Sequence, residues 1–444
     1  MPLTPQFLGR SFWQRSLCAL ALLGVLAGCS DPDIILIGAR EDVRSGATDD
    51  QLPAAPLDRP IRLPAQSVNA EWAAPIGSTR ASHAALRAVP QLAWSTRIGE
   101  GNSRKNRIAT PPIMSGGLIY TMDALSNVTA TTPQGAVVWQ IDMAKTLDVT
   151  GKVSGGGLTY DDGTLYATTG YGALLALDAR SGAVRWIQKL GATGSGSPLV
   201  RGSLIYVMAG DDRVWALRRD NGRIVWQLEG TPTVANILGG PAPVWTGSLV
   251  VFAFSSGEIQ ATFPQGGLVR WSASVSGQRR GVAVARISSV TGAPVVSGGR
   301  IYAGNHSGRI VALDANSGER LWTAAHGAMD PVWPVGGSLF VVSDKNRLLR
   351  INAADGQVIW AADLPGFVKE RSRRRGGQYA NYGPILAGGS IIVASGDGQL
   401  RFFDPASGRL KASIEIPGGA ASAPIVAGQT LYVLSAKGDL HAFR

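Results

Sequence analysis

The feature that most constrains this chain is a glycine followed four residues later by a tryptophan, a pair that recurs about every 40 to 50 residues. Self-similarity at such a period indicates a repeat architecture and has to be interpreted before any local motif. One further copy, at Gly408, has Ala412 in place of the tryptophan. The complete copies are Gly135/Trp139, Gly182/Trp186, Gly222/Trp226, Gly267/Trp271, Gly318/Trp322 and Gly356/Trp360.

A second signature alternates with the first and consists of a proline, two apolar residues, any residue and a glycine. Between each proline unit and its tryptophan unit lie two runs rich in β-branched and aromatic residues, divided by a short turn. Each period therefore predicts four short strands, and about 45 residues for four strands is typical of a β-propeller blade. The proline units are 112–116, 198–202, 243–247, 294–298, 384–388 and 424–428, with degenerate units expected near 153–157 and 331–336.

The repeats predict an all-β fold, an eight-bladed β-propeller of four-stranded antiparallel blades over residues 90–444. Asp178 and Gly182 would bracket the turn between the third and fourth strands, where aspartate can bond its own turn and glycine adopts a left-handed backbone. Trp186 would stand on the outer strand and fill the gap between adjacent blades. The last repeat stops before a fourth strand, so we expect the N-terminal strand around Trp94 to join the C-terminal blade and close the ring.

The first residues of the chain predict an export signal. Arg10 and Arg15 precede an uncharged apolar stretch that is too short for a comfortable membrane span of about 20 residues. The stretch ends in LAGC at residues 26–29, which resembles the bacterial lipobox. In that family of signals, cleavage precedes the cysteine, which is lipidated. We therefore expect residues 1–28 to be a lipoprotein signal peptide and Cys29 the lipid attachment site, with a plain signal or an uncleaved anchor as alternatives.

The residue after the cysteine is Ser30, which by resemblance to enterobacterial sorting favours a lipid-anchored location on the periplasmic face of the outer membrane. Residues 29–89 carry few periodic apolar patterns and several prolines, so we expect a lipidated, extended tether between anchor and propeller. Within the tether, residues 68–85 include Trp72 and are candidates for packing on the folded domain.

Residues that carry chemistry are sparse. Cys18 and Cys29 both lie near the N-terminus, so the repeats contain no thiol for a disulfide or a thiolate metal site. The histidines fall in different units and are interpreted as turn or strand residues, and the recurrent aspartates as turn residues. With no P-loop, nucleophile elbow or HExxH motif, we expect no catalytic residue, metal or cofactor. These histidines are His83, His306, His326 and His441, and these aspartates are Asp178, Asp314 and Asp404.

The formal net charge is +11, and part of it gathers in three clusters. Each cluster follows a strand tryptophan by roughly ten residues, which places all three in connections from an outer strand to the next inner strand, on one face of the disc. They are either solvated loop charges or an electropositive rim for acidic protein surfaces or anionic lipid headgroups. Without interleaved aromatic residues, nucleic acid is not an expected partner. The clusters are Arg104, Lys105 and Arg107; Arg279 and Arg280; and Lys369, Arg371, Arg373, Arg374 and Arg375.

The pattern AxDxxxGxxxW resembles the PQQ-type β-propeller repeat. Together with the lipobox, the tether and the chain length, it resembles the BamB family, lipoproteins of the outer-membrane β-barrel assembly (BAM) machinery, and residues 61–86 resemble its alphaproteobacterial branch. This resemblance implies a non-enzymatic periplasmic scaffold without a cofactor. Its partners would be the POTRA domains of BamA, other BAM subunits and nascent outer-membrane proteins, whose assembly and insertion it would assist.

The resemblance also implies a partner-binding surface on the outer-to-inner loops. Leu238 stands where the family has an arginine, and Ser289 and Thr291 stand where it has acids. The residues that correspond to the family surface are Asn236, Ile237, Leu238, Gly239, Arg286, Ile287, Ser289 and Thr291, to which we add the basic Arg279, Arg280, Arg373, Arg374 and Arg375.

The same repeat builds quinoprotein dehydrogenases, so a PQQ-dependent enzyme is an alternative. Those enzymes carry an adjacent cysteine pair and a calcium site of acids and an asparagine, whereas Cys29 is the last cysteine of this chain. A generic periplasmic interaction propeller is a further alternative, because a fold alone does not define a function.

Overall fold

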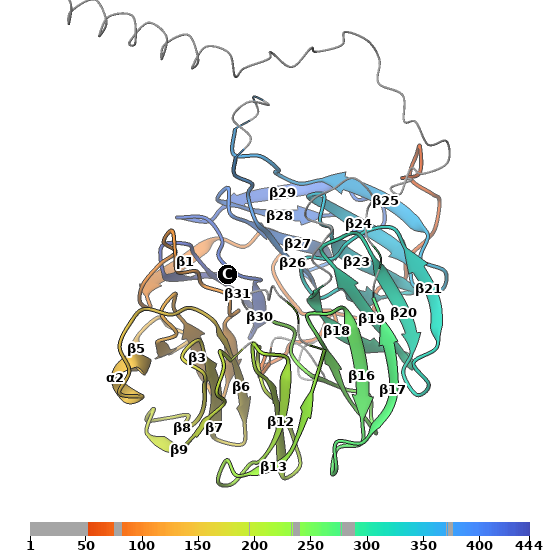
Figure 1. The fold of residues 1–444 in the computed structure, drawn as a ribbon. Coiled ribbons are helices and arrows are strands. Elements are labelled where there is room, and N and C mark those ends of the chain that lie inside the picture. The colour runs from red at the N-terminus through yellow and green to blue at the C-terminus, as the bar shows by residue number, and fades with distance from the viewer. Residues whose placement is uncertain are drawn as a thin grey trace, which may run out of the picture. The chain divides into compact units, whose positions relative to one another are not determined.

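Eight antiparallel sheets of four strands each follow one another around a ring in the described part of the chain (Figure 1). This confirms the predicted all-β, eight-bladed propeller. The protein is described by a computed structural model, in which residues 49–444 form one unit. The predicted signal peptide and Cys29 lie outside the described residues. The described residues are 52–74, 82–194, 196–231, 233, 240–275, 277, 289–369, 371 and 376–444.

We number the sheets along the chain. Sheet 1 contains β2 (Ile113–Ser115), β3 (Leu118–Met122), β4 (Val128–Thr131) and β5 (Val137–Ile141), and sheet 2 contains β6 (Gly156–Asp161), β7 (Thr164–Thr169), β8 (Ala173–Asp178) and β9 (Val184–Lys189). Sheet 3 contains β10 (Leu199–Arg201), β11 (Leu204–Met208), β12 (Arg213–Arg218) and β13 (Ile224–Glu229), and sheet 4 contains β14 (Val244–Trp245), β15 (Val250–Ala253), β16 (Glu258–Thr262) and β17 (Val269–Ser274).

Sheet 5 contains β18 (Val290–Ser297), β19 (Arg300–Asn305), β20 (Ile310–Asp314) and β21 (Arg320–Ala324), and sheet 6 contains β22 (Trp333–Val335), β23 (Ser338–Val342), β24 (Arg347–Asn352) and β25 (Val358–Asp363). Sheet 7 contains β26 (Asn381–Ala387), β27 (Ser390–Ser395), β28 (Gln399–Phe403) and β29 (Leu410–Glu415). Sheet 8 contains β30 (Ile425–Ala427), β31 (Thr430–Leu434), β32 (Asp439–Phe443) and β1 (Leu92–Arg97), and the short helix α2 (Met143–Thr146) connects sheets 1 and 2.

The predicted position of one inner strand is wrong. The sequence places the proline unit of sheet 2 near residues 153–157, but the strand is β6 (Gly156–Asp161), and its hairpin turn has Gly163 at a φ of 73°. Thr159 occupies the position that proline has in the complete units, so the signature loses its most recognisable residue there. The nearby glycines 155–157 then imitate the end of a unit.

Sheet 8 joins the two ends of the propeller. β1 pairs antiparallel with β32, with Ser95 opposite His441 and Thr96 opposite Leu440. Gln91 and Arg444 extend the pairing, since each backbone N–H donates to the other's carbonyl, at 2.7 and 2.9 Å. A fourth strand from the start of the chain thus completes a sheet whose other three strands come from its end.

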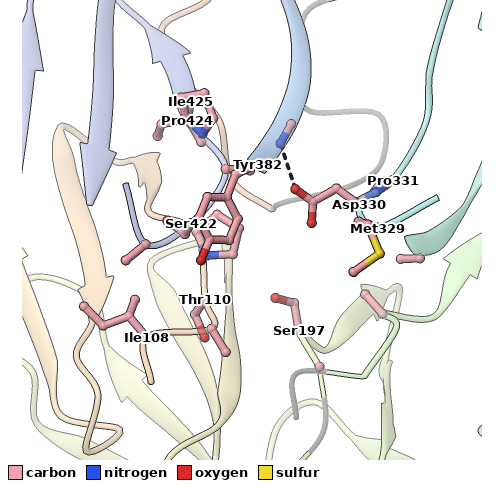
Figure 2. Close-up of a pocket in the computed structure, with 18 of the residues that line it drawn as sticks. Ile108, Thr110, Ser197, Met329, Asp330, Pro331, Tyr382, Ser422, Pro424 and Ile425 are labelled. Carbon is pink, nitrogen blue, oxygen red and sulfur yellow. Dashed lines mark hydrogen bonds between the residues drawn. The ribbon is translucent and has the colours of Figure 1, made fainter. Parts of the chain in front are cut away.

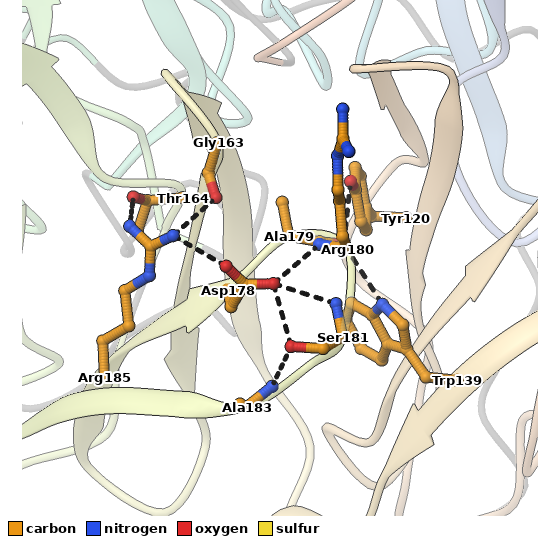
Figure 3. Close-up of polar contacts among 10 residues, drawn as sticks. All are labelled: Tyr120, Trp139, Gly163, Thr164, Asp178, Ala179, Arg180, Ser181, Ala183 and Arg185. Carbon is orange, nitrogen blue, oxygen red and sulfur yellow. Dashed lines mark hydrogen bonds and ion pairs between the residues drawn. The ribbon is translucent and has the colours of Figure 1, made fainter.

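The turn between the third and fourth strands is held by its aspartate, as the sequence predicts (Figure 3). Asp178 Oδ1 accepts hydrogen bonds from the backbone N–H of Arg180 and from the N–H and hydroxyl of Ser181. Gly182 has a φ of 75°. The Arg185 guanidinium, 2.8 Å from Oδ2, and the Ser181 donors hold the pKa of Asp178 well below its usual range. The recurrent aspartate therefore closes a turn.

In every sheet except sheet 7, the outer-strand tryptophan lies on the turn glycine of the following sheet. A Cβ placed on Gly222 would lie 2.6 Å from Cε3 of Trp186, so only glycine allows this contact. Trp186 Nε1 also donates to the carbonyl of Arg219 in the same turn, at 3.2 Å. The equivalent pairs are Trp94/Gly135, Trp139/Gly182, Trp226/Gly267, Trp271/Gly318, Trp322/Gly356 and Trp360/Gly408, and each indole donates to a backbone carbonyl of the facing turn.

The copy without tryptophan lies where the facing turn is missing. Ala412 of sheet 7 pairs with Phe402, the register position that Trp186 holds opposite Ala176. The next sheet is sheet 8, whose third and fourth strands come from opposite ends of the chain. No glycine turn joins β32 to β1, so an indole at position 412 would have nothing of that kind to cover.

These contacts predict the effects of two substitutions. We expect Trp360→Ala to lower the free energy of unfolding by about 3 kcal/mol, because Trp360 is fully buried against Gly408. We expect Ala412→Trp to give no gain, although it restores the repeat consensus. Urea denaturation followed by circular dichroism measures both, with the exposed Val225→Ala as control. A stabilising Ala412→Trp would contradict our interpretation of the missing tryptophan.

Candidate functional site

A cavity of about 410 Å³ occupies the centre of the ring (Figure 2). Apart from Trp72, its lining comes from all eight sheets and consists of residues in or just before the first strand of each, such as Thr110, Ser197 and Pro424. In every sheet the first strand starts where the connection from the preceding outer strand ends. The cavity therefore lies among the outer-to-inner connections, where the sequence predicts the partner-binding surface.

The chain before β1 crosses the ring. We call residues 52–74 and 82–90 the N-terminal strap. Trp72 exchanges backbone hydrogen bonds with Met114 of β2, at 2.6 and 3.0 Å, and its indole stacks on Trp333 of β22 with ring centroids 6.2 Å apart. Trp72 lines the central cavity, while the neighbouring Ala73 and Ala74 line a second cavity of about 400 Å³. The strap thus lies across the channel of the propeller.

A buried arginine fastens the strap. Arg350 of β24 is 1% exposed and stands at the register position where sheets 2, 3 and 5 have alanine. Its guanidinium donates to the carbonyls of Arg59 and Pro60 in the strap, at 2.9 and 3.2 Å, and to Ala406 of sheet 7 at 3.2 Å. Its Nε donates to Ser338. One side chain therefore connects the strap to two neighbouring sheets.

Asp330 is the one carboxylate in the described lining of the central cavity. Oδ2 accepts a hydrogen bond from the backbone N–H of Gly383 at 2.7 Å, and no described basic group forms an ion pair with it (Figure 2). Its enclosure raises the pKa of Asp330 to about 6, and burial together with the charge of Asp330 raises the pKa of Tyr382 to about 12. The cavity therefore holds a half-desolvated carboxylate beside a neutral phenol.

Sequence reasoning missed Asp330 and Arg350. Asp330 precedes the degenerate proline unit of sheet 6, and Arg350 lies in RIN, where other repeats have an alanine before the turn aspartate. For Arg350, a charged residue at a repeat position that is alanine in most other sheets was the available signal. The position of Asp330 gave no such signal, because other repeats have Thr110, Tyr382 or Ser422 there.

The structure describes only part of the predicted binding surface. Ser289 is buried, while Thr291 lines the central cavity and donates its hydroxyl to the carbonyl of Ala328. Residues outside the described parts are Asn236, Ile237, Leu238, Gly239, Arg279, Arg280, Arg286, Ile287, Arg373, Arg374 and Arg375.

The described basic loop residues are solvent-exposed. Arg104, Lys105 and Arg107 belong to the connection that leads into β2, and Lys369 and Arg371 to the one that leads into β26. Arg107 lines the mouth of the central cavity. None of the five forms an ion pair with another described residue, so their charges remain available on this face.

The histidines occupy separate places. His83 accepts a hydrogen bond from the N–H of Gly389, and His441 contacts Ser95 and the carbonyl of Pro417. Within the described ranges, no group of three histidine, cysteine or acidic side chains could hold a metal ion. Nor does this part of the chain contain a helix of the length and apolarity that a membrane crossing requires.

Comparison with known proteins identifies a family. The protein-family model described as "Outer membrane protein assembly factor BamB" matches residues 124–362 and 369–444 of this chain. BamB of Burkholderia pseudomallei is 28% identical over 362 residues, which cover 80% of this chain and 88% of that protein.

Two solved structures share the fold. BamB from Moraxella catarrhalis is 20% identical with a TM-score of 0.67, over 80% of this chain and all of that chain. The quinohemoprotein alcohol dehydrogenase from Comamonas testosteroni is 14% identical with a TM-score of 0.63, over 85% of this chain and 81% of that chain. These two likenesses concern the fold alone.

The strap contact predicts a local effect. We expect Arg350→Met to accelerate amide hydrogen exchange around residues 57–62 by at least about tenfold, because the strap loses its hydrogen bonds to the guanidinium. Arg347→Met, on the same strand in an exposed ion pair with Asp363, is the control. Unchanged exchange at Leu57, whose N–H donates to Ile359, would contradict the role of Arg350.

The pKa of Asp330 predicts a pH-dependent cost. When folding raises the pKa of a carboxyl group, ionisation of that group destabilises the folded state. This destabilisation is absent at a pH below the unfolded pKa near 4 and complete at a pH above about 6. We expect Asp330→Asn to raise the free energy of unfolding by about 2 kcal/mol at pH 7.5, an effect that disappears near pH 4. Denaturation of both proteins across this range measures the difference, with Asp363→Asn as control. A destabilising substitution at pH 7.5 would contradict it.

Proposed function

Because the chain belongs to the BamB family of outer membrane protein assembly factors, we propose that it is a non-catalytic scaffold subunit of the machinery that assembles β-barrel proteins in the outer membrane. The family match, which extends over most of the propeller, is the observation that carries this conclusion. The architecture supports it, because a closed ring of rigid sheets leaves loops as the variable surface.

The proposed partner is the set of POTRA domains of BamA, with the other BAM subunits and nascent outer-membrane proteins as further partners. The face that carries the outer-to-inner loops is the proposed contact surface. Exposed cations without ion partners support this assignment, since they attract an acidic surface from a distance and orient its approach. Among the described residues these cations are Arg104, Lys105, Arg107, Lys369 and Arg371.

We further propose that Cys29 carries the lipid and that Ser30 directs the protein to the outer membrane, with its propeller on the periplasmic side. The lipobox and the charge pattern of residues 1–28 support this proposal. Lipid attachment would keep the scaffold at the membrane where its partners work.

Quinone-dependent catalysis is the weaker alternative. PQQ carries three carboxylates, and the described lining of the central cavity offers Arg107 at its mouth but a carboxylate, Asp330, inside. The described residues also lack a group of acids suited to a metal. This residue set does not fit the cofactor, and we derive no reaction through it.

Charge reversal tests the contact face. We expect the triple substitution Arg373→Glu, Arg374→Glu and Arg375→Glu, and separately Arg104→Glu with Lys105→Glu, to weaken binding of purified BamA POTRA domains by about tenfold or more at low salt. The loss should shrink at high salt because ions screen exposed charges. Biolayer interferometry at two ionic strengths measures it.

The control is a triple reversal on the opposite face. Arg180, Arg223 and Arg409 are exposed in or next to the turns between third and fourth strands, so their reversal changes net charge equally without touching the loop face. Equal weakening by both triple substitutions, or none by either loop variant, would refute the proposed face. Co-purification from detergent-solubilised outer membrane tests the partner itself, with BamA expected in the eluate.

A further inference from the structure

The central cavity has the composition of a ligand site. Its described walls are mostly apolar and include Ile108, Met329, Pro331 and Ile425, with a few polar groups among them (Figure 2). A volume of about 410 Å³ falls in the range of small-molecule sites. Trp72 of the strap belongs to the lining, so the strap separates this space from the second cavity beyond it.

Two buried polar side chains in the lining lack a partner. Ser422 is 3% exposed and its Oγ makes no hydrogen bond with described residues, and the same holds for Nε1 of Trp72, which is 2% exposed. Buried polar groups are almost always paired in folded proteins. Each of these two atoms has less than 1 Å² of accessible surface, so both lie behind the lining and do not face the open space. The carboxylate of Asp330 is therefore the group of the described lining that indicates a polar ligand.

The charge of Asp330 selects the sign of that ligand. An anion would meet a carboxylate, and a purely apolar ligand would leave that carboxylate desolvated without compensation. A divalent metal ion would need several oxygen ligands, whereas the described lining supplies one carboxyl group. A cation on an apolar stem fits both the carboxylate and the walls, and the aromatic rings of Tyr382 and Trp72 are favourable neighbours for it.

We propose that the central cavity is a binding site for an ammonium group carried on an apolar chain, with Asp330 as the residue that pairs with the cation. The cavity lies among the outer-to-inner loops, so the ligand enters from the loop face. It is either a free organic amine or a lysine side chain inserted by a partner, and both present the same chemistry. The site does not depend on the identity of any BAM subunit.

The test uses the full-length protein in nanodiscs, with empty nanodiscs subtracted. The probes are n-hexylammonium, the blocked peptide acetyl-Gly-Lys-Gly-amide, and n-hexanol as the neutral match, measured by saturation-transfer NMR and calorimetry. Asp330→Asn keeps an oxygen acceptor for the Gly383 N–H but removes the charge. Asp363→Asn removes a charge at an exposed outer-strand position and is the matched control.

We expect wild type and Asp363→Asn to bind n-hexylammonium at least about tenfold more tightly than Asp330→Asn does, with hexanol equally weak in all three. Binding of the lysine peptide as well would assign a protein side chain as the source, and binding of the amine alone would assign a free amine. Equal binding of hexylammonium by Asp330→Asn and wild type, or none by wild type, would overturn the proposal.

Two further measurements test the site without substituting Asp330. Ala109→Trp fills the exposed mouth of the cavity without touching Asp330, and it should abolish binding. Amine affinity should also fall as the pH drops from 7.5 to 5. Apart from the guanidinium of Arg107, the described charged or titratable groups in the lining are Tyr382 and Asp330. Burial keeps the Tyr382 phenol neutral over that range, which leaves Asp330 as the group that titrates. Undiminished binding in Ala109→Trp, or pH-independent affinity, would refute the site.

Discussion

The contact between an indole and a glycine turn is the interaction on which this ring depends. Each sheet is a small twisted layer whose apolar faces are buried only when neighbouring sheets pack against them. The two neighbouring sheets have to pack at a defined angle for the ring to close. The indole provides both buried apolar surface and a directional hydrogen bond. Its ring covers the glycine while Nε1 donates to a carbonyl of the same turn, as Trp186 does with Gly222 and Arg219. Position and orientation of the next sheet are thereby set together.

The junction without an indole is held differently. Between sheets 7 and 8, the strap contributes contacts to both sides. Ala84 bridges to Ala387 of β26, and Asn69 donates to the carbonyl of Val426 in β30 at 2.7 Å. Buried residues of sheets 6 to 8 and of the strap, including Trp72 and Leu86, share one hydrophobic cluster. The strap therefore reinforces the seam at which the repeat lacks its tryptophan and the two chain ends meet.

The repeat made most of the fold predictable, because the residues of the indole–glycine contact recur in the sequence at a regular spacing. Gly182 and Trp186 needed no partner information, since their roles follow from their residue types and spacing. The strap was not predictable in this way. Its partners are backbone groups scattered over several sheets, such as the carbonyl of Leu386 that receives the N–H of Ala84, and such contacts impose no periodic pattern on residues 52–90. Thr159 shows a different limit of the repeat pattern. Because threonine replaces the signature proline there, the strand could not be located from the sequence, although the fold retains it.

Asp330 illustrates why a functional group escapes repeat-based reasoning. A sequence repeat shows the residues that all sheets share. The cavity, in contrast, is lined by residues from every sheet, and these residues differ from one sheet to the next. The carboxylate raises no packing density and completes no turn, and its enclosure opposes ionisation. Selection for stability alone would favour a neutral residue at that position, as in the other sheets. An enclosed carboxylate at the centre of the ring lowers stability, so binding of a ligand explains its presence better than a structural role does.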